Sequence, residues 1–407
     1  MPDTTRHAML QDSVQLTVRK NRAGPVLGRH PWVFAGAIDC IPEGLATGQH
    51  VRLVTSDGRY LASGLFNGYS QITVRVWSWE DEHPDLAFFE RRIRSALEFR
   101  RAAISSPETD SYRLIFSEND LIPGLVVDRY ADYLCLQLHN RAIEAWKDLI
   151  VEALVNVVKP KGIYERSDVT VRQREGAESR QGPLVGEIPE AVTIRENGHR
   201  FLVDLVHGQK TGFFLDQRDK RLAAARWAAG RRVLNCFCYT GGFSIYAGAR
   251  GAAHVASVDA SSRALDIARE NVRLNGLDER LFTWECADAK GFLDQLVHAG
   301  TPSPCDMIIL DPPAFIKDRR KIKEGQVGYR RINEAAFRLL PKDGILVTSS
   351  CSAHLSLEDF RYLLSESAAR AGRTVQVLEN HAHGADHPEL VPFTECRYLK
   401  CLILRVL

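Results

Sequence analysis

Apolar and polar residues alternate with two different periods along the chain, and the first third is dominated by a period of two. Between residues 11 and 78, the runs SVQLTV, HVRLVT and QITVRVW alternate apolar with polar side chains and are separated by turns rich in Gly and Asn. Such alternation is typical of half-buried β-strands. The pattern predicts a small β-barrel or sandwich over residues 11–78.

The next stretch, residues 80–195, mixes both periods and predicts an α+β middle domain. In its first part Phe89, Ile93 and Leu97 recur every fourth residue, and the arginines around them suit either RNA contact or a solvated helix face. The predicted elements are a helix at 84–104, a hairpin at 125–138, a helix at 142–158, a strand at 162–166 and a polar surface loop at 172–183.

From residue 232 onward, short apolar strands alternate regularly with helices. This order predicts a Rossmann-like, doubly wound and mostly parallel sheet within a domain spanning residues 196–407. No helix is expected between the last two strands, which predicts an antiparallel pair at one edge. The expected strands are VLNCF, HVASV, FTWEC, DMIIL, ILVTS, TVQVL and YLKCLILRV, with helices at 261–275, 329–340 and 357–371.

Composition adds few constraints to this picture. A chain of 407 residues is long enough for two or three domains, and its net charge of +2 neither requires nor excludes a nucleic-acid partner. The N-terminal MPDTTRHAML lacks the apolar segment of a signal peptide, and no apolar run is long enough for a membrane span. We therefore expect a cytoplasmic protein with no membrane association, whose nine cysteines are reduced.

The ends of the first three strands of this sheet carry residues suited to an adenosine-containing ligand. Gly241 and Gly242 lie at the first strand-to-helix turn, where they allow close approach of the backbone. Asp259 ends the second strand and can accept hydrogen bonds from two ribose hydroxyls, and Asp288 follows the third strand, where it can bind an adenine amino group. A dehydrogenase is disfavoured because the glycine pattern that cradles a pyrophosphate is missing.

The fourth strand ends in the segment AspProProAlaPhe at 311–315. A carboxylate at a strand end, followed by two stiffening prolines and an aromatic ring, suits a flat heteroaromatic substrate. The alternative is a proline-terminated strand with a buried Phe.

Several segments together resemble the class I methyltransferases that modify carbon 5 of cytosine in large-subunit ribosomal RNA and carry an N-terminal PUA domain. The resemblance covers nearly the whole chain. It is carried by HPWVFAGAI at 30–38, GLVVDRY at 124–130, GQKTGFFLDQR at 208–218, VLNCFCYTGGFS at 233–244, DPPAF at 311–315 and SSCS at 349–352.

The resemblance implies S-adenosylmethionine (SAM) as cofactor, a PUA-type RNA-binding module at 11–78 and large-subunit ribosomal RNA as partner; a homodimer is compatible with it. The chain has Ala314 where many relatives have Lys, which removes one cation near the substrate. The implied cofactor contacts are Gln209, Thr211, Phe213, Arg218, Asn235, Phe237, Tyr239, Thr240, Gly241, Gly242, Asp259, Asp288, Ala289 and Asp311. The implied substrate contacts are Pro312, Pro313, Phe315, Lys317, Arg319, Arg320, Lys20, Arg22, Arg29 and His30.

Methylation of cytosine at carbon 5 requires a nucleophile on the enzyme. Carbon 5 is too weakly nucleophilic to be methylated directly, so a thiolate must first add to carbon 6. Cys351 follows the strand 345–349 and should emerge at the same sheet edge as Asp311. The expected catalytic residues are therefore Cys351 as nucleophile and Asp311 as hydrogen-bond partner of the base.

Two other functions remain open from the sequence. One is SAM-dependent N-methylation of an RNA purine, which needs no cysteine, and the other is a non-catalytic RNA-binding assembly factor. No metal is expected, because Cys236 and Cys238 have no second pair. The histidines His381, His383 and His387 are expected in a surface or substrate loop.

Overall fold

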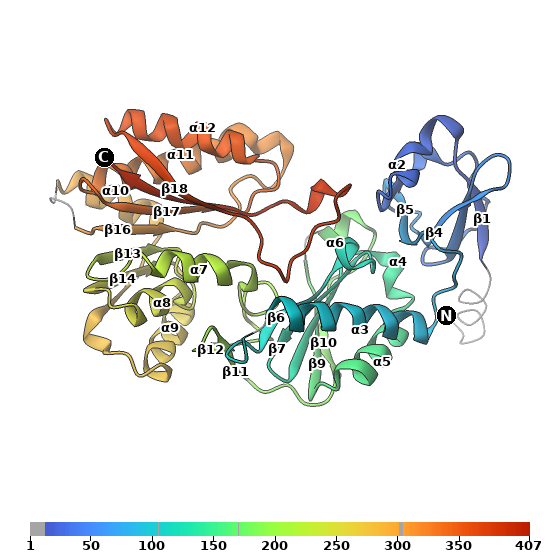
Figure 1. Ribbon diagram of the computed structural model, residues 1–407, viewed down its shortest axis with the longest axis horizontal. Helices are drawn as coiled ribbons and strands as arrows, with labels where there is room; N and C mark the ends of the chain where they lie inside the picture. The colour runs from blue at the N-terminus through green and yellow to red at the C-terminus, as the bar shows by residue number, and fades with distance from the viewer. Residues whose placement is uncertain (1–12, 105, 170, 301–303) are drawn as a thin grey trace. The chain divides into compact units, whose positions relative to one another are not determined.

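Three β-sheets and one short hairpin organise the described chain (Figure 1). The computed structural model describes residues 13–104, 106–169, 171–300 and 304–407, so the N-terminal segment MPDTTRHAML and residues 11 and 12 of the predicted first domain lie outside it. The described chain divides into two units, the first comprising residues up to Ile194 together with Val203–Leu215 and Ala385–Thr394. The second comprises Arg195–Leu202, Asp216–Gly384 and Glu395–Leu407, so two segments of the predicted domain 196–407 belong to the first unit.

The first sheet follows the predicted alternation and contains two strands that the pattern missed. Its order is β1-β3-β4-β5-β2, formed by β1 (Val14–Thr17), β2 (Trp32–Phe34), β3 (His50–Val54), β4 (Tyr60–Phe66) and β5 (Ile72–Ser78), with the short helix α2 (Gly24–Leu27). One of the missed strands, β4, has Ser63 and Gly64 at its centre. A Cβ at Gly64 would lie 2.1 Å from the carbonyl oxygen of Arg75 on β5, so the close approach of the two strands requires glycine there.

The second sheet has the order β10-β9-β8-β7-β6 and confirms the hairpin at 125–138. Its strands are β6 (Ser111–Phe116), β7 (Leu125–Tyr130), β8 (Tyr133–Leu138), β9 (Gly162–Ser167) and β10 (Arg180–Val185), and its helices are α3 (Leu86–Ala103), α4 (Arg141–Glu144), α5 (Lys147–Val158) and α6 (Val171–Arg174). The helix predicted over 142–158 is therefore two helices. They are separated near Trp146, whose indole N–H donates to the carbonyl oxygen of Gly48 at 2.8 Å.

The loop predicted at 172–183 is shorter in the structure, where only residues 175–179 lack regular secondary structure. Its first residues belong to α6 and its last residues belong to β10, which pairs antiparallel with β9. Arg172 is only 1% exposed, because its guanidinium donates to the carbonyl oxygens of Leu138 and Glu178 and contacts Glu144. The burial of Arg172 is an exception, since most of the other side chains in this segment are exposed, as the polar sequence predicts.

A hairpin of β11 (Val192–Glu196) and β12 (His199–Val203) precedes the sheet of the second unit. That sheet has the order β15-β14-β13-β16-β17-β19-β18, and its first five strands are parallel. The strands are β13 (Arg232–Cys236), β14 (His254–Asp259), β15 (Phe282–Cys286), β16 (Met307–Leu310), β17 (Ile345–Ser350), β18 (Val375–His381) and β19 (Lys400–Val406). The last two pair antiparallel at one edge, which confirms the predicted doubly wound sheet.

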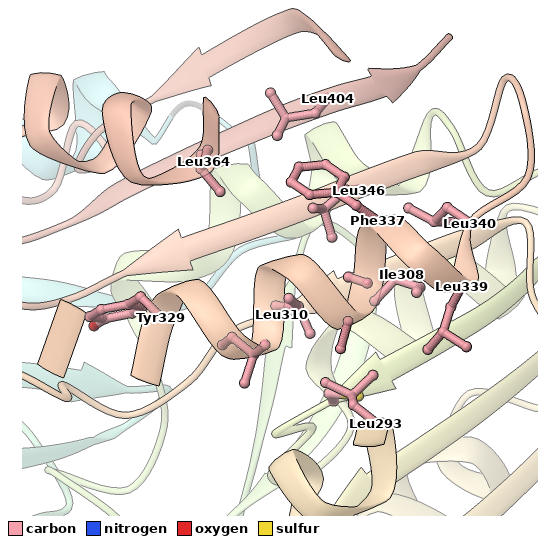
Figure 2. Close-up of a cluster of buried hydrophobic side chains, with 14 of the residues drawn as sticks. Leu293, Ile308, Leu310, Tyr329, Phe337, Leu339, Leu340, Leu346, Leu364 and Leu404 are labelled. Carbon is pink, nitrogen blue, oxygen red and sulfur yellow. The ribbon is translucent and has the colours of Figure 1, made fainter. Parts of the chain in front are cut away.

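Helices cover both faces of this sheet, as Figure 1 shows. On one face lie α7 (Arg218–Ala225), α8 (Gly242–Ala249) and α9 (Ser262–Leu274), and on the other α10 (Ala289–His298), α11 (Ile322–Leu339) and α12 (Leu357–Arg370). Under the second group, Leu310, Leu346 and Leu404 of the sheet pack with Phe337 of α11 and Leu364 of α12 (Figure 2). This apolar layer fixes α11 and α12 over the strands whose ends carry the candidate catalytic residues.

The predicted surface position of His387 is wrong, because its ring is buried in the first unit, 5.2 Å between centroids from Phe116. His383 lies in the second unit with its ring 4.4 Å from that of Tyr398. None of the described helices combines the length and the apolar character needed to cross a membrane.

Candidate active site

The carboxyl ends of the five parallel strands lie at one edge of the second unit's sheet. Strand order reverses between β13 and β16, since β14 and β15 extend the sheet on one side and β17 extends it on the other. In open parallel sheets, ligands bind in the crevice at such a reversal. The residues predicted from the sequence at strand ends therefore meet at this edge.

The loop after β13 is shaped by backbone conformation. Phe237, Tyr239 and Gly241 all have positive φ, at 60°, 49° and 79°. A Cβ on Gly241 would lie 3.0 Å from Cβ of Ala268, and one on Gly242 would lie 3.0 Å from Cδ of Arg221. The tight turn and the packing therefore require the two glycines, whether or not a ligand binds. Phe237 and Tyr239 are non-glycine residues in the left-handed region, and such backbone strain is typical of functional sites.

Asp259 ends β14 and is oriented by two backbone donors. The N–H of Tyr239 donates to Oδ2 at 2.8 Å, and the N–H of Ser261 donates to Oδ1 at 2.9 Å. Each carboxylate oxygen has a further lone pair. A half-buried carboxylate held in this way can accept both hydroxyls of a ribose.

Asp288 follows β15 and is exposed. Its Oδ2 accepts the N–H of Gly291 at 3.0 Å and so caps the N-terminus of α10, while the neighbouring Ala289 is buried. This cap fixes the carboxylate at the strand end and leaves it acceptor capacity for an amino group.

Asn235, at the end of β13, is fully buried. Its amide donates to Oγ of Ser244 at 2.8 Å, which ties the strand to the first turn of α8. Thr240 is buried as well, and its carbonyl oxygen accepts from the side-chain amide of Asn271 at 2.9 Å. These two predicted cofactor residues therefore hold the loop in place through their own contacts.

At the end of β16, Asp311 is held by a residue that the sequence interpretation did not select. The side-chain amide of the buried Gln217 donates to Oδ1 of Asp311 at 2.7 Å. Arg218, which the resemblance did select, is buried and pairs with Asp219 at 3.2 Å. The only sequence signal for Gln217 was its position inside the segment 208–218.

The structure brings Cys351 to this same edge. The half-buried thiol lies after β17, with Sγ 3.7 Å from the carbonyl oxygen of Pro312, the residue after Asp311. Ser352 fastens the two loops together, because its Oγ accepts the N–H of Ile316 at 3.1 Å and lies 2.9 Å from the hydroxyl of Tyr329 on α11. Tyr329 carried no signal in the sequence, and the only signal for Ser352 was its position inside the segment 349–352.

The ring of Phe315 is partly covered in the structure. Its centroid lies 4.7 Å from the ring of Tyr329, and the ammonium of Lys290 lies 4.0 Å from the same centroid. Of the two prolines before it, Pro312 is buried and Pro313 is exposed. Lys290 places a cation close to the segment 311–315, in which Ala314 itself carries no charge.

The basic residues after this segment are exposed and structured. Lys317 precedes the turn Arg319–Lys321, in which Arg320 pairs with Asp318 at 3.0 Å, and α11 begins at Ile322 rather than at the predicted 329. In the first unit, Lys20, Arg22 and Arg29 are also exposed, and the guanidinium of Arg29 lies over Trp79. His30 is half-buried, with its ring against Trp32.

Residues 209–213 lie in the first unit and are described there. Thr211 is 1% exposed, and its hydroxyl donates to Oδ2 of Asp128 at 2.6 Å and contacts the hydroxyl of Tyr130 at 2.8 Å. Phe213 is buried with its N–H on the same tyrosine hydroxyl, whereas Gln209 is exposed. Their role toward a cofactor stays a prediction.

Comparison with known proteins defines the class of this site. Residues 160–405 match the family described as S-adenosylmethionine-dependent methyltransferase, and residues 16–79 match a PUA-like domain. A methyltransferase-like protein solved with SAH has a TM-score of 0.83 at 23% identity, covering 97% of this chain and 100% of that one. A SAM-dependent methyltransferase-like protein of Streptococcus mutans has a TM-score of 0.80 at 24% identity, with the same coverage.

The fold and the strand-end residues therefore define a class I SAM-dependent methyltransferase, with SAM as its cofactor. The residues at the strand ends fit this cofactor. The carboxylates of Asp259 and Asp288 follow neighbouring strands and can accept hydrogen bonds from the hydroxyl and amino groups of an adenosine.

The particular family follows from curated relatives over the whole chain. The protein named ribosomal RNA large subunit methyltransferase I is 43% identical in Aeromonas hydrophila over 396 residues, covering 97% of this chain and 99% of the relative. The protein of that name in Escherichia coli is 41% identical over 397 residues, covering 97% and 100%. The chain belongs to this family of PUA-containing methyltransferases, and the comparisons give no support for the homodimer.

Proposed function

We propose that this protein methylates carbon 5 of a cytosine in large-subunit ribosomal RNA through a covalent adduct with Cys351. The observation that carries the proposal is the position of the Cys351 thiol, 3.7 Å from the carbonyl oxygen of Pro312 and beside the Asp311 segment. N-methylation of an amino group needs a carboxylate near the methyl donor but no thiol at this edge. The names of the relatives support ribosomal RNA as the substrate class.

In the proposed reaction, the Cys351 thiolate forms a bond to carbon 6, and carbon 5 becomes electron-rich. Asp311, whose Oδ1 is held by Gln217, hydrogen-bonds the ring nitrogen or amino group of the cytosine and so orients the base beside the thiolate. Bound SAM supplies an electrophilic methyl group to carbon 5. Loss of the carbon 5 proton to a base then breaks the carbon 6 to sulfur bond and releases Cys351 as thiolate.

The cofactor contacts in this proposal come from the strand ends of the second unit. Asp259 accepts the ribose hydroxyls, Asp288 accepts the adenine amino group, and the backbone around Gly241 and Gly242 lies against the ligand. The other predicted contacts in that unit are Arg218, Asn235, Phe237, Tyr239, Thr240 and Ala289. Asn235 and Thr240 act by holding the loop, since both side chains are buried.

RNA contacts are proposed from two groups of exposed cations. The first follows the catalytic segment and comprises Lys317, Arg319 and Arg320, and the second lies in the PUA-like domain and comprises Lys20, Arg22 and Arg29, together with His30. Cations bind the phosphate backbone irrespective of sequence. The target base must leave its stack to reach a pocket at a sheet edge, which favours unpaired RNA as the substrate.

The test is methyl transfer from labelled SAM into ribosomal RNA from cells lacking the enzyme, followed by nucleoside analysis. We expect labelled 5-methylcytidine with the unaltered protein and none with Cys351→Ala. The matched control is Cys40→Ala, which removes an exposed thiol of the PUA-like domain and should leave turnover unchanged. A methylated purine formed by an active Cys351→Ala variant would establish N-methylation instead, and SAM binding without transfer to any RNA would indicate an assembly factor.

A further inference from the structure

A buried lysine lies beside the candidate nucleophile, and the mechanism above does not use it. Lys400 opens β19 and pairs in register with Ser350, the last residue of β17 and the neighbour of Cys351. It is 7% exposed in a strand that is otherwise almost entirely apolar. A cation in such a position needs a specific reason, because burying a charge without a counter-charge is costly.

Among the described residues, Lys400 donates hydrogen bonds to neutral groups. Its ammonium donates to the carbonyl oxygen of Ser352 at 2.6 Å and to that of Tyr398 at 2.9 Å. Both acceptors are neutral, and an ammonium has three protons, so one proton remains for another acceptor. Because Ser352 directly follows Cys351 in the chain, the hydrogen bond to the Ser352 carbonyl oxygen holds the ammonium near the Cys351 residue.

Electrostatics link the two groups directly. Burial lowers the pKa of Lys400 to about 8, and negative charge on Cys351 is the one influence that acts in the opposite direction. An amine with a pKa of about 8 is still largely protonated at neutral pH, so Lys400 places a positive charge next to Cys351. A cation beside a thiol favours the thiolate.

The other titratable groups around the thiol do not replace Lys400. Tyr329 approaches from α11, and burial first, then negative charge on Cys351, raises the pKa of its phenol, which keeps the hydroxyl neutral. Asp311, at the end of β16, is an acid and cannot supply a positive charge. Among these groups, Lys400 is the one that can balance a thiolate.

We propose that the Lys400 ammonium is the counter-ion of the Cys351 thiolate, and so sets how much of the nucleophile is ionised at neutral pH. The S–H bond of Cys351 breaks, its proton leaves to solvent, and the thiolate forms an ion pair with the ammonium of Lys400. While the Cys351 sulfur is bonded to carbon 6, it is uncharged and no longer pairs with the ammonium. Release of Cys351 as thiolate restores the ion pair. Lys400 is therefore a positioning residue that acts through Cys351, and its role rests on the proposed function of that cysteine.

The test is the pH dependence of iodoacetamide alkylation at each cysteine of the full chain, measured by peptide mass spectrometry without RNA or SAM. We expect the alkylation midpoint of Cys351 to lie about one pH unit or more below the midpoints of the exposed thiols Cys40 and Cys286. In Lys400→Met the Cys351 midpoint should rise to ~8.5 or above, so that alkylation at pH 7 slows roughly tenfold. Lys400→Arg keeps a cation and should retain a low midpoint, and Lys342→Met removes an exposed lysine as the matched control.

Two outcomes overturn the proposal. One is a Cys351 midpoint in the unaltered protein equal to that of Cys286, a result that needs no variant to fold. The other is an unchanged midpoint in Lys400→Met, which would mean that the lysine only ties down the carbonyl oxygens of Ser352 and Tyr398. Alkylation needs no substrate, so it tests the ionisation of Cys351 and not its catalytic role. The methyl-transfer assay tests that role separately, so the two proposals can fail independently.

Discussion

At the scale of single residues, the carboxylates of the site are useful because backbone groups orient them. Asp259 receives N–H groups from Tyr239 and Ser261, and Asp288 receives one from Gly291. The sequence could locate these acids because each follows an apolar strand. It could not show the donors, since the N–H of Tyr239 comes from the end of a neighbouring strand.

Asp259→Ala should weaken SAH binding by about ten- to a hundredfold, because a hydrogen bond to a charged group contributes roughly 1.5–3 kcal/mol. Titration calorimetry with SAH measures the effect. Asp266→Ala, which removes an exposed carboxylate of α9, should leave the affinity unchanged. Equal affinities for Asp259→Ala and the unaltered protein would remove Asp259 from the cofactor site.

At the scale of elements, the start of α11 changes the meaning of the basic run at 317–323. Residues 319–321 form a turn capped by Asp318, and α11 begins immediately after it rather than at the predicted residue 329. Five exposed cations are thereby presented from a defined surface next to the Asp311 segment. The periodicity missed this because the first two turns of α11, IKEGQVG, contain two glycines that weaken the helical signal.

Replacing Lys317, Arg319 and Lys321 together by Gln should weaken RNA binding and make it less dependent on salt. Each lost contact to single-stranded phosphate reduces the slope of log K against log salt by about 0.7. Filter binding across a salt series measures that slope. A control triple of Arg280, Lys342 and Arg361 to Gln removes the same charge elsewhere in the second unit, and an equal change in both triples would mean that only net charge matters.

At the scale of the whole molecule, the two units are interleaved along the chain. The segment Ala385–Thr394 belongs to the first unit although it separates the last two strands of the second unit's sheet. Asp386 is fully buried there, with Oδ2 accepting the N–H of Arg113 at 3.1 Å and its carbonyl oxygen accepting from Arg100 at 3.1 Å. Residues nearly 300 positions apart thus complete one core.

Asp386→Ala should destabilise the first unit by about 1–3 kcal/mol, because the N–H of Arg113 loses its acceptor in a buried setting. Hydrogen exchange should accelerate in peptides covering β6 while peptides of β13 and β16 stay protected. Asp57→Ala, at an exposed turn of the same unit, is the control. Uniform acceleration in both units would show that they unfold as one.

The sequence by itself determined the doubly wound sheet, the alternating strands of the first domain and the strand-end residues Asp259, Asp288, Asp311 and Cys351. These follow from local periodicity, because a parallel strand buried on both faces is apolar and its functional residues come at its end. Only the tertiary structure decided that Gln217 holds Asp311, that Arg172 is buried, and that Lys400 lies beside Cys351. Such pairings join residues distant in sequence. A buried polar residue needs a hydrogen-bond partner, but the local sequence around it does not identify that partner.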